Sequence, residues 1–182
     1  MVSDDRQTVL EAREQYFAMS GFNADTYTDN WVRLPILGFQ LRLPNFSARK
    51  KAVPLHDIDH ILTGYKTDWK GEGLISAYEL GTGCGRYWAA WAINLQGILI
   101  GLIHSPAEAL RAFARGRRSK GVYRFSSYED LLSKQVTELR RDTTASAEVS
   151  ISVSDVTLFA GIVLFSVVLH VGVPLLLIST LF

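Results

Sequence analysis

Cysteine is almost absent from this 182-residue chain, which contains only Cys84. A single cysteine excludes an internal disulfide and any zinc site built from several cysteines. Because Cys84 lies among glycines with no histidine near it in the sequence, we expect a buried, inert thiol and not a nucleophile. Histidine is scarce too, with four residues, so two that lie close together need an explanation.

The chain also lacks an excess of either charge. Nineteen Lys and Arg residues stand against eighteen Asp and Glu residues, which gives a formal net charge of +1. This balance provides no general attraction to nucleic acid, so no nucleic-acid partner is predicted. The first residues are acidic and contain no apolar segment, which predicts that there is no secretory signal peptide.

No charged side chain occurs in residues 156–182. As a helix these 27 residues would be about 40 Å long, against a hydrocarbon core of about 30 Å. We therefore predict a transmembrane helix over residues 155–182, after a Ser- and Ala-rich linker over residues 143–154. The alternative is a buried core helix, but a domain this small seldom hides a helix that is apolar all round. Pro174 predicts a kink in the span or marks its last turns.

Basic residues lie on the N-terminal side of this span and none follows it. The positive-inside tendency therefore places the domain on the cytoplasmic side of a bacterial inner membrane, or on the matrix side of a mitochondrial inner membrane. The residues concerned are Arg111, Arg115, Arg117, Arg118, Lys120, Arg124, Lys134, Arg140 and Arg141.

Helical periodicity dominates residues 1–142, which we interpret as one helical domain. Apolar spacing predicts helices over residues 3–19, 55–65 and 72–103. Helix starts are predicted at Ser105 and Ser126, where a hydroxyl cap is followed three residues later by a glutamate. Three prolines in residues 24–54 predict short helices and loops there. Since no alternating strand of useful length is present, the fold class is all-α, with one C-terminal transmembrane helix.

Two of the four histidines lie in the stretch HDIDHILTGYKTDWKGE, residues 56–72. His56 and His60 are four residues apart, so on a helix their imidazoles share one face. Asp57 can add an oxygen ligand or orient a histidine, and Glu72 can return as a further ligand after the turn. Two nitrogens with one or two oxygens suit a divalent metal ion, zinc or iron more than calcium.

Three other interpretations compete with this metal site. A histidine pair can arise by chance on a solvated helix. Zinc peptidases of the HExxH type need a Glu next to the first histidine, and Asp57 is one carbon too short for that role. Phosphohydrolases of the HD type need a histidine upstream, and none precedes His56.

The motif HDxxH followed after eleven residues by Glu resembles that of coenzyme Q biosynthesis protein four, a ubiquinone-pathway family. The intervening LTGY and GE resemble the family as well, and Glu79 stands where the family often has a second Glu. Further likeness lies in FARGRRSKGVY and in DLLSKQVTELRRD, so that it extends over residues 45–142.

This resemblance implies an all-helical, membrane-associated protein that binds a divalent metal through His56, Asp57, His60 and Glu72. It implies a polyprenylated aromatic precursor as ligand, and we expect the isoprenoid tail to lie along residues 88–103. The family is linked to oxidative decarboxylation at ring position C1 and to organising other quinone-pathway proteins. The sequence assigns no catalytic residue and leaves turnover open.

A transmembrane helix is not a usual feature of that family. An alternative function is therefore a non-catalytic accessory subunit of a membrane respiratory or photosynthetic complex that keeps this fold. A span that packs on partner helices would be its docking device.

Overall fold

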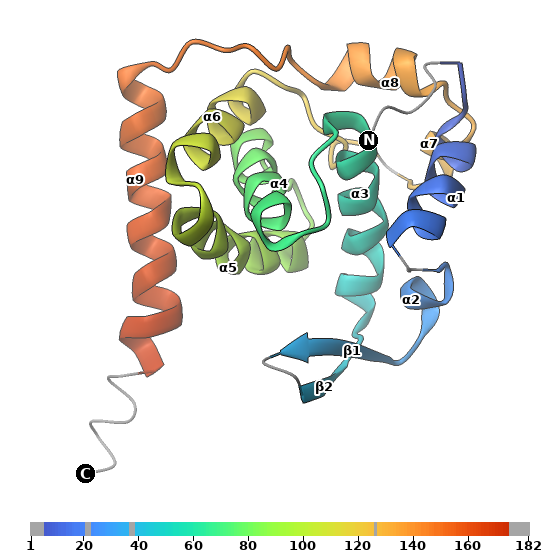
Figure 1. The fold of residues 1–182 in the computed structure, drawn as a ribbon, viewed down its shortest axis with the longest axis horizontal. Helices are drawn as coiled ribbons and strands as arrows, with labels where there is room; N and C mark the ends of the chain where they lie inside the picture. Colours follow the sequence, from blue (N-terminus) through green and yellow to red (C-terminus); the bar gives the residue numbers. More distant parts are fainter. Residues whose placement is uncertain (1–5, 21–22, 37–38, 126, 175–182) are drawn as a thin grey trace.

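The computed structural model describes residues 6–20, 23–36, 39–125 and 127–174. Helix accounts for about 71% of the structure, which confirms the all-α class (Figure 1). In the described part of the chain the elements are α1 (Val9–Ser20), α2 (Asp25–Thr28), β1 (Trp31–Ile36), β2 (Phe39–Pro44), α3 (Ser47–Thr63), α4 (Trp69–Thr82), α5 (Trp88–His104), α6 (Pro106–Arg117), α7 (Glu129–Leu132), α8 (Val136–Thr143), α9 (Val153–Val167) and the π-helical turn η1 (Val168–Gly172).

Helices α4, α5 and α6 form the centre of the molecule and approach one another closely at glycines (Figure 1). A Cβ atom on Gly73 of α4 would lie 2.3 Å from the Cα atom of Gly101 of α5. A Cβ atom on Gly81 would lie 2.3 Å from the carbonyl oxygen of Phe113 in α6. Any larger side chain at these two positions would force the helices apart.

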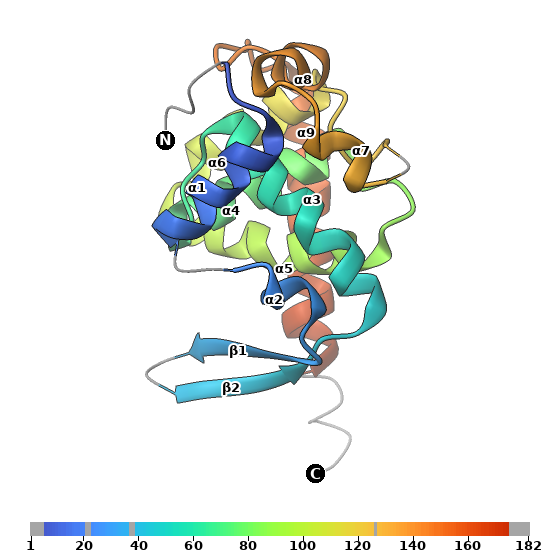
Figure 2. The same ribbon diagram turned by 90° about the vertical axis from the view of Figure 1, so that its right-hand side faces the viewer.

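Helix α3 lies between this centre and a second layer formed by α1, α7 and α8 (Figures 1 and 2). Its C-terminal carbonyl groups are held by two arginines from later helices. Arg140 Nε donates to Leu62 O at 2.9 Å, and Arg115 donates to Thr63 O at 3.4 Å. Guanidinium groups at a helix C-terminus satisfy its free carbonyls and match its dipole. The end of α3 is therefore fixed where the functional residues lie.

The helix predicted over residues 72–103 is wrong as a single element. It is divided into α4 and α5 by a turn in which Gly83 has φ 79° and Gly85 has φ 50°. Both angles lie in the left-handed region that interrupts a right-handed helix and favours glycine. The helix predicted to start at Ser126, a residue outside the described part of the chain, is also divided, into α7 and α8.

Residues 24–54 also differ from expectation, because they include an antiparallel hairpin of β1 and β2. The hairpin projects from the helices at the end where α9 finishes (Figure 2). A lone hairpin leaves both outer edges free, so Pro35 and Pro44 need not donate to a neighbouring strand. The turn content of this segment was predicted, but its strands were missed.

Helix α9 begins at Val153, two residues before the predicted start of the span, and its cap is Ser152. Ser152 and Asp155 form a capping box, in which the Ser152 hydroxyl accepts from Asp155 N at 3.2 Å. Together α9 and η1 cover Val153–Gly172, which by length and composition can cross a membrane. The π-helical turn precedes Pro174, whose ring cannot donate a backbone hydrogen bond to the preceding turn.

One side of α9 packs on the domain from its second turn to its last. Phe159 contacts Phe113 with ring centroids 5.5 Å apart, and the Ser166 hydroxyl donates to Leu95 O. Residues 144–152, which precede α9, contain no helix or strand. The position of the linker boundaries stays a prediction.

Candidate metal centre

Helix α3 places the two histidines, and the turn after it brings back the glutamate. His56 and His60 are one turn apart near the end of α3, which stops at Gly64 with φ 78°. Asp68 then caps α4 by accepting from Gly71 N at 2.7 Å. Glu72 is in the first turn of α4 and so points back toward α3. The predicted geometry of the motif, one helical turn followed by a bend, is present.

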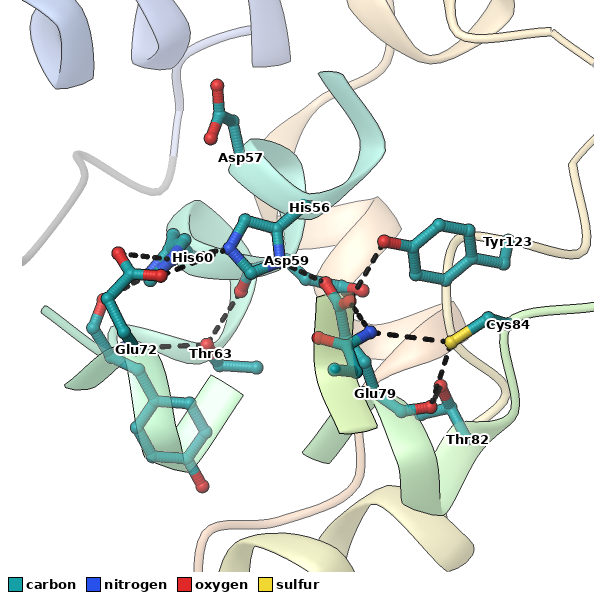
Figure 3. Close-up of polar contacts among 12 residues, drawn as sticks. His56, Asp57, Asp59, His60, Thr63, Glu72, Glu79, Thr82, Cys84 and Tyr123 are labelled. Atoms are coloured by element: carbon teal, nitrogen blue, oxygen red, sulfur yellow. Dashed lines mark hydrogen bonds and ion pairs between the residues drawn. The ribbon is translucent and has the colours of Figure 1, made fainter. Parts of the chain in front are cut away.

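The side chains of His56, His60 and Glu72 converge on one point (Figure 3). The two Nε2 atoms of the histidines are 3.2 Å apart. Glu72 Oε2 lies 3.4 Å from His56 Nε2, and Glu72 Oε1 lies 3.5 Å from His60 Nε2. His60 is buried, whereas His56 and Glu72 are partly exposed, so the group can be reached from solvent.

The second nitrogen of each histidine faces a fixed acceptor. His60 Nδ1 is 2.9 Å from Tyr65 O, and a carbonyl oxygen only accepts, so Nδ1 carries the proton. His56 Nδ1 is 2.9 Å from the Glu79 Oε1 carboxylate oxygen. When neutral, both rings therefore present an Nε2 lone pair to the shared centre, which is the tautomer that binds metals through Nε2.

These separations leave room for a metal ion between the three side chains. Zinc bonds to imidazole nitrogen and carboxylate oxygen are about 2.0–2.1 Å long, so that neighbouring ligand atoms lie about 3.3–3.4 Å apart. The two Nε2 atoms are 3.2 Å apart, and each lies 3.4 or 3.5 Å from a different oxygen of Glu72; with one ligand atom per residue, the three atoms lie within 4.8 Å of one another. The group of His56, His60 and Glu72 can thus hold one ion. Three protein ligands leave a fourth position for water or another small ligand.

The charges around the centre attract a cation. Burial alone lowers the pKa of His56, but the carboxylates of Glu79 and Glu72 outweigh it and raise that pKa well above its usual value. Burial also raises the pKa of Glu72, but the hydrogen bonds and charges of the two imidazoles together outweigh burial and lower that pKa. Without a metal, a proton on His56 supplies the positive charge that the carboxylates require.

Asp57, predicted as a ligand or an orienting partner, points away from the three other side chains (Figure 3). Tyr27 Oη donates to Asp57 Oδ2 at 2.6 Å, and Tyr16 Oη donates to Asp57 Oδ1 at 3.3 Å. Tyr16 also stacks on the His60 ring with centroids 6.0 Å apart. In this arrangement Asp57 supports the surroundings of the histidines, and its direct contact with a metal stays a prediction.

Glu79 lies behind His56 in a closed polar network and is completely buried. Its other oxygen, Oε2, accepts from Asn94 Nδ2 at 2.5 Å and from Tyr123 Oη at 2.8 Å (Figure 3). Asp59 adjoins the same carboxylate, and burial together with the charge of Glu79 raises the pKa of Asp59 well above its usual value. Neither carboxyl oxygen of Asp59 has a hydrogen-bond partner among the described residues, and burial next to Glu79 favours its neutral form.

Sequence reasoning found only part of this inner network. Glu79 was noted through the family resemblance, without a role, and Asp59, Asn94 and Tyr123 were missed. One signal was available, since Glu79 lies seven residues after Glu72 and so on the same helix face. Cys84 is free and buried beside this network, as predicted, and burial raises the pKa of its thiol.

Two surface hollows of about 500 and 370 Å³ lie elsewhere. The first is lined partly by Lys50, Lys51 and Arg86, and the second partly by Arg115 and Arg140. Neither is lined by the three converging side chains or by α5.

In comparisons with known proteins, the chain matches no family model, no curated protein and no solved structure. The likeness to the coenzyme Q family thus depends on the motif and on the clustering of His56, His60 and Glu72.

Proposed function

We propose that this chain is a membrane-tethered, metal-binding protein of ubiquinone biosynthesis. Its His56, His60 and Glu72 side chains hold a divalent ion, zinc or iron, and it binds a polyprenylated aromatic precursor near that ion. The pathway and the ligand come from the motif resemblance. The geometry supports the metal alone.

One observation carries the metal assignment. Two histidine nitrogens and a carboxylate oxygen, all within 4.8 Å of one another, point at one centre, while both opposite ring nitrogens are tied to acceptors. A proton can bridge only two of these atoms at a time. A metal ion can bind all three at once.

The chain's own residues would have two tasks in such a site. His56 and His60 provide neutral nitrogen ligands, and Glu72 provides a negative oxygen that offsets part of the ion's charge. A bound divalent ion supplies Lewis acidity, which orients and polarises the oxygen atoms of a phenol or carboxylate. The partial exposure of Glu72 leaves that side open for the ligand's ring.

The resemblance also implies oxidative decarboxylation at ring position C1, and this is the reaction to assay. We expect the precursor to be a prenylated ring that still carries its carboxylate. Association with other quinone-pathway proteins is part of the same proposal.

The test is purification of the full chain in mild detergent, followed by elemental analysis and extraction of bound lipid. We expect an equimolar amount of zinc or iron and a prenyl-tailed quinone precursor. His60→Ala should lose the metal and the quinone product together. His104→Ala is the matched control, because His104 is exposed and its ring bonds to Ile100 O within its own helix.

Full metal content in His60→Ala would contradict the ligand assignment. A stable multi-subunit particle that lacks the precursor would instead favour the alternative function, an accessory subunit of a membrane complex.

A further inference from the structure

One face of α5 is apolar and uncovered. Five residues spaced by four, four, three and four positions form it, and we name this set the α5 outer face. Trp88 is 60% exposed and Ile103 is 80% exposed, which is unusual for such large apolar side chains. The complete set is Trp88, Ala92, Gln96, Leu99 and Ile103, of which only Leu99 is half-buried.

The opposite face of α5 fixes this orientation. A Cβ atom on Gly97 would lie 2.0 Å from the Ser76 hydroxyl oxygen of α4, and Gly101 meets Gly73 at the same interface. Since α5 cannot rotate without breaking this contact, the outer face stays outward. Its exposure is therefore a property of the packed domain.

The outer face is continuous with the exposed side of α9. Ser166 of α9 donates to Leu95 O, next to Gln96 in the outer face. Beyond this contact α9 and η1 present further exposed apolar side chains, among them Val168 and Leu169. With histidine neutral, neither α5 nor residues 156–174 contain a charged side chain, so a single uncharged surface crosses both helices.

Charge is confined to the other end of α9. Asp155 in its first turn binds Arg117 and Arg118 of the α6 end, the latter at 2.9 Å. The last turns of α9 lie at the end of the molecule where the hairpin is, and α5 lies nearer to that end than Asp155 does (Figures 1 and 2). Polarity thus decreases along α9 from its N-terminus to its C-terminus.

An aromatic pair borders the outer face. Phe46 stacks on Trp88 with ring centroids 5.3 Å apart and planes 5° apart, and both rings are exposed. Trp is enriched where a protein meets the interfacial layer of a membrane.

We infer that the α5 outer face lies against a lipid bilayer, with α5 parallel to the membrane plane, and that the exposed apolar side of α9 contacts the same lipid. The inference goes beyond the proposed function, because it concerns how the domain sits on the membrane and not what the metal site does. It makes α5 an interfacial helix whose second face is the protein core.

A lipid occupant fits this surface better than a protein. Gln96 is its one polar side chain, so it offers almost no directional hydrogen bond or charge to fix a partner's orientation. A bilayer requires only apolar area and interfacial aromatic rings.

The experiment places a single cysteine on the full chain at Ala92→Cys or Ile103→Cys and attaches an environment-sensitive fluorophore. Arg111→Cys is the control, because Arg111 is exposed on the polar helix α6. The parent chain should not label, since Cys84 is buried. Each labelled chain is reconstituted in phosphatidylcholine vesicles with and without brominated acyl chains.

We expect blue-shifted emission and quenching by brominated lipid at Ala92 and Ile103, and water-like, unquenched emission at Arg111. Adding Ala92→Asp should shift the Ile103 label toward water-like emission, while circular dichroism remains helical. Water-like emission at both α5 positions would overturn the inference. Blue-shifted emission without bromine quenching would also overturn it, because a protein would then cover the face.

Discussion

Two clusters of acids and bases in this protein differ in what they leave unsatisfied. At the start of α9, Asp155 accepts from Arg117, Arg118 and the Ser152 backbone and hydroxyl, so the protein itself pairs the carboxylate completely. Between α3 and α4, His56, His60 and Glu72 aim electron pairs at one another.

The difference separates a structural ion pair from a candidate site. In the Asp155 cluster, arginine cations contact a carboxylate anion, and no further ligand is needed. In the metal cluster, two imidazoles with fixed tautomers and a carboxylate need a proton or a metal at their centre. The spacing of His56, His60 and Glu72 predicted their cluster, whereas no local pattern joins Asp155 to Arg117 and Arg118, which are 38 and 37 residues away. The geometry shows that the Asp155 cluster is complete.

The largest effect should come from removing the carboxylate of the metal cluster. Glu72→Ala deletes the one negatively charged member of the three ligands, and we expect metal affinity to fall by more than about 100-fold, beyond the loss typical of an outer-shell change. Isothermal titration with zinc measures it. Glu108→Ala is the control, because Glu108 also begins a helix but pairs with Lys70. Equal zinc affinity in Glu72→Ala and Glu108→Ala would contradict the role of Glu72 as a metal ligand.

Metal binding should also depend strongly on pH. The raised pKa of His56 means that a proton occupies the site of the metal-free protein at neutral pH. Metal must displace this proton, so affinity should increase about tenfold per pH unit until the raised pKa is passed. Competition titrations from about pH 6 to pH 8 measure the slope, and a flat profile would show that no proton is displaced.

The same shift has a consequence for the stability of the metal-free chain. Because the folded pKa of His56 is raised above its unfolded value of about 6.5, protonation stabilises the fold fully below that pH. This contribution is lost as pH rises through the raised pKa. Thermal unfolding of metal-free protein should therefore occur at lower temperature at high pH, and added zinc should remove the difference.

Glu79→Gln should have an intermediate effect on the metal. The substitution keeps the shape but removes the charge that fixes the Nδ1 proton of His56, and we expect a loss of affinity of roughly tenfold. A shifted absorption spectrum of bound cobalt would show that the ligand field has changed. Tyr123→Phe removes a donor to the far oxygen of Glu79 and should cost less. An unchanged affinity and spectrum in Glu79→Gln would mean that Glu79 does not orient His56.

The smallest effect is expected at the complete cluster. Asp155→Ala removes a helix cap and two ion pairs, so it should lower the free energy of unfolding by about 1–2 kcal/mol and leave metal affinity unchanged. Asp142→Ala is the control. Asp142 pairs with Arg141 on the exposed surface, so its removal should change the free energy of unfolding very little. Weaker metal binding in Asp155→Ala would break the distinction between the clusters.

Local spacing predicted the features that depend on one or two turns of chain. The four-residue step between His56 and His60 and the bend before Glu72 were sufficient to predict the cluster. The uncharged tail likewise predicted a helix with the length and composition of a membrane span. In both cases the structure depends on residues that are close in the sequence, because helical periodicity determines which of them share a face.

Features that depend on distant contacts were not predictable. Asp57 faces Tyr16 and Tyr27, which come from α1 and α2 and whose approach no local pattern reveals. Glu79 is held by Asn94 and Tyr123, which are 15 and 44 residues away. The break between α4 and α5 was missed because apolar periodicity on both sides concealed the two left-handed glycines.

The most direct test of the central claim is titration of the purified, metal-free chain with cobalt, followed by visible absorption. We expect saturation at one cobalt per chain with the intense bands of a tetrahedral ion, and loss of these bands in His60→Ala. No binding by the native chain, or the same spectrum in His60→Ala, would contradict it.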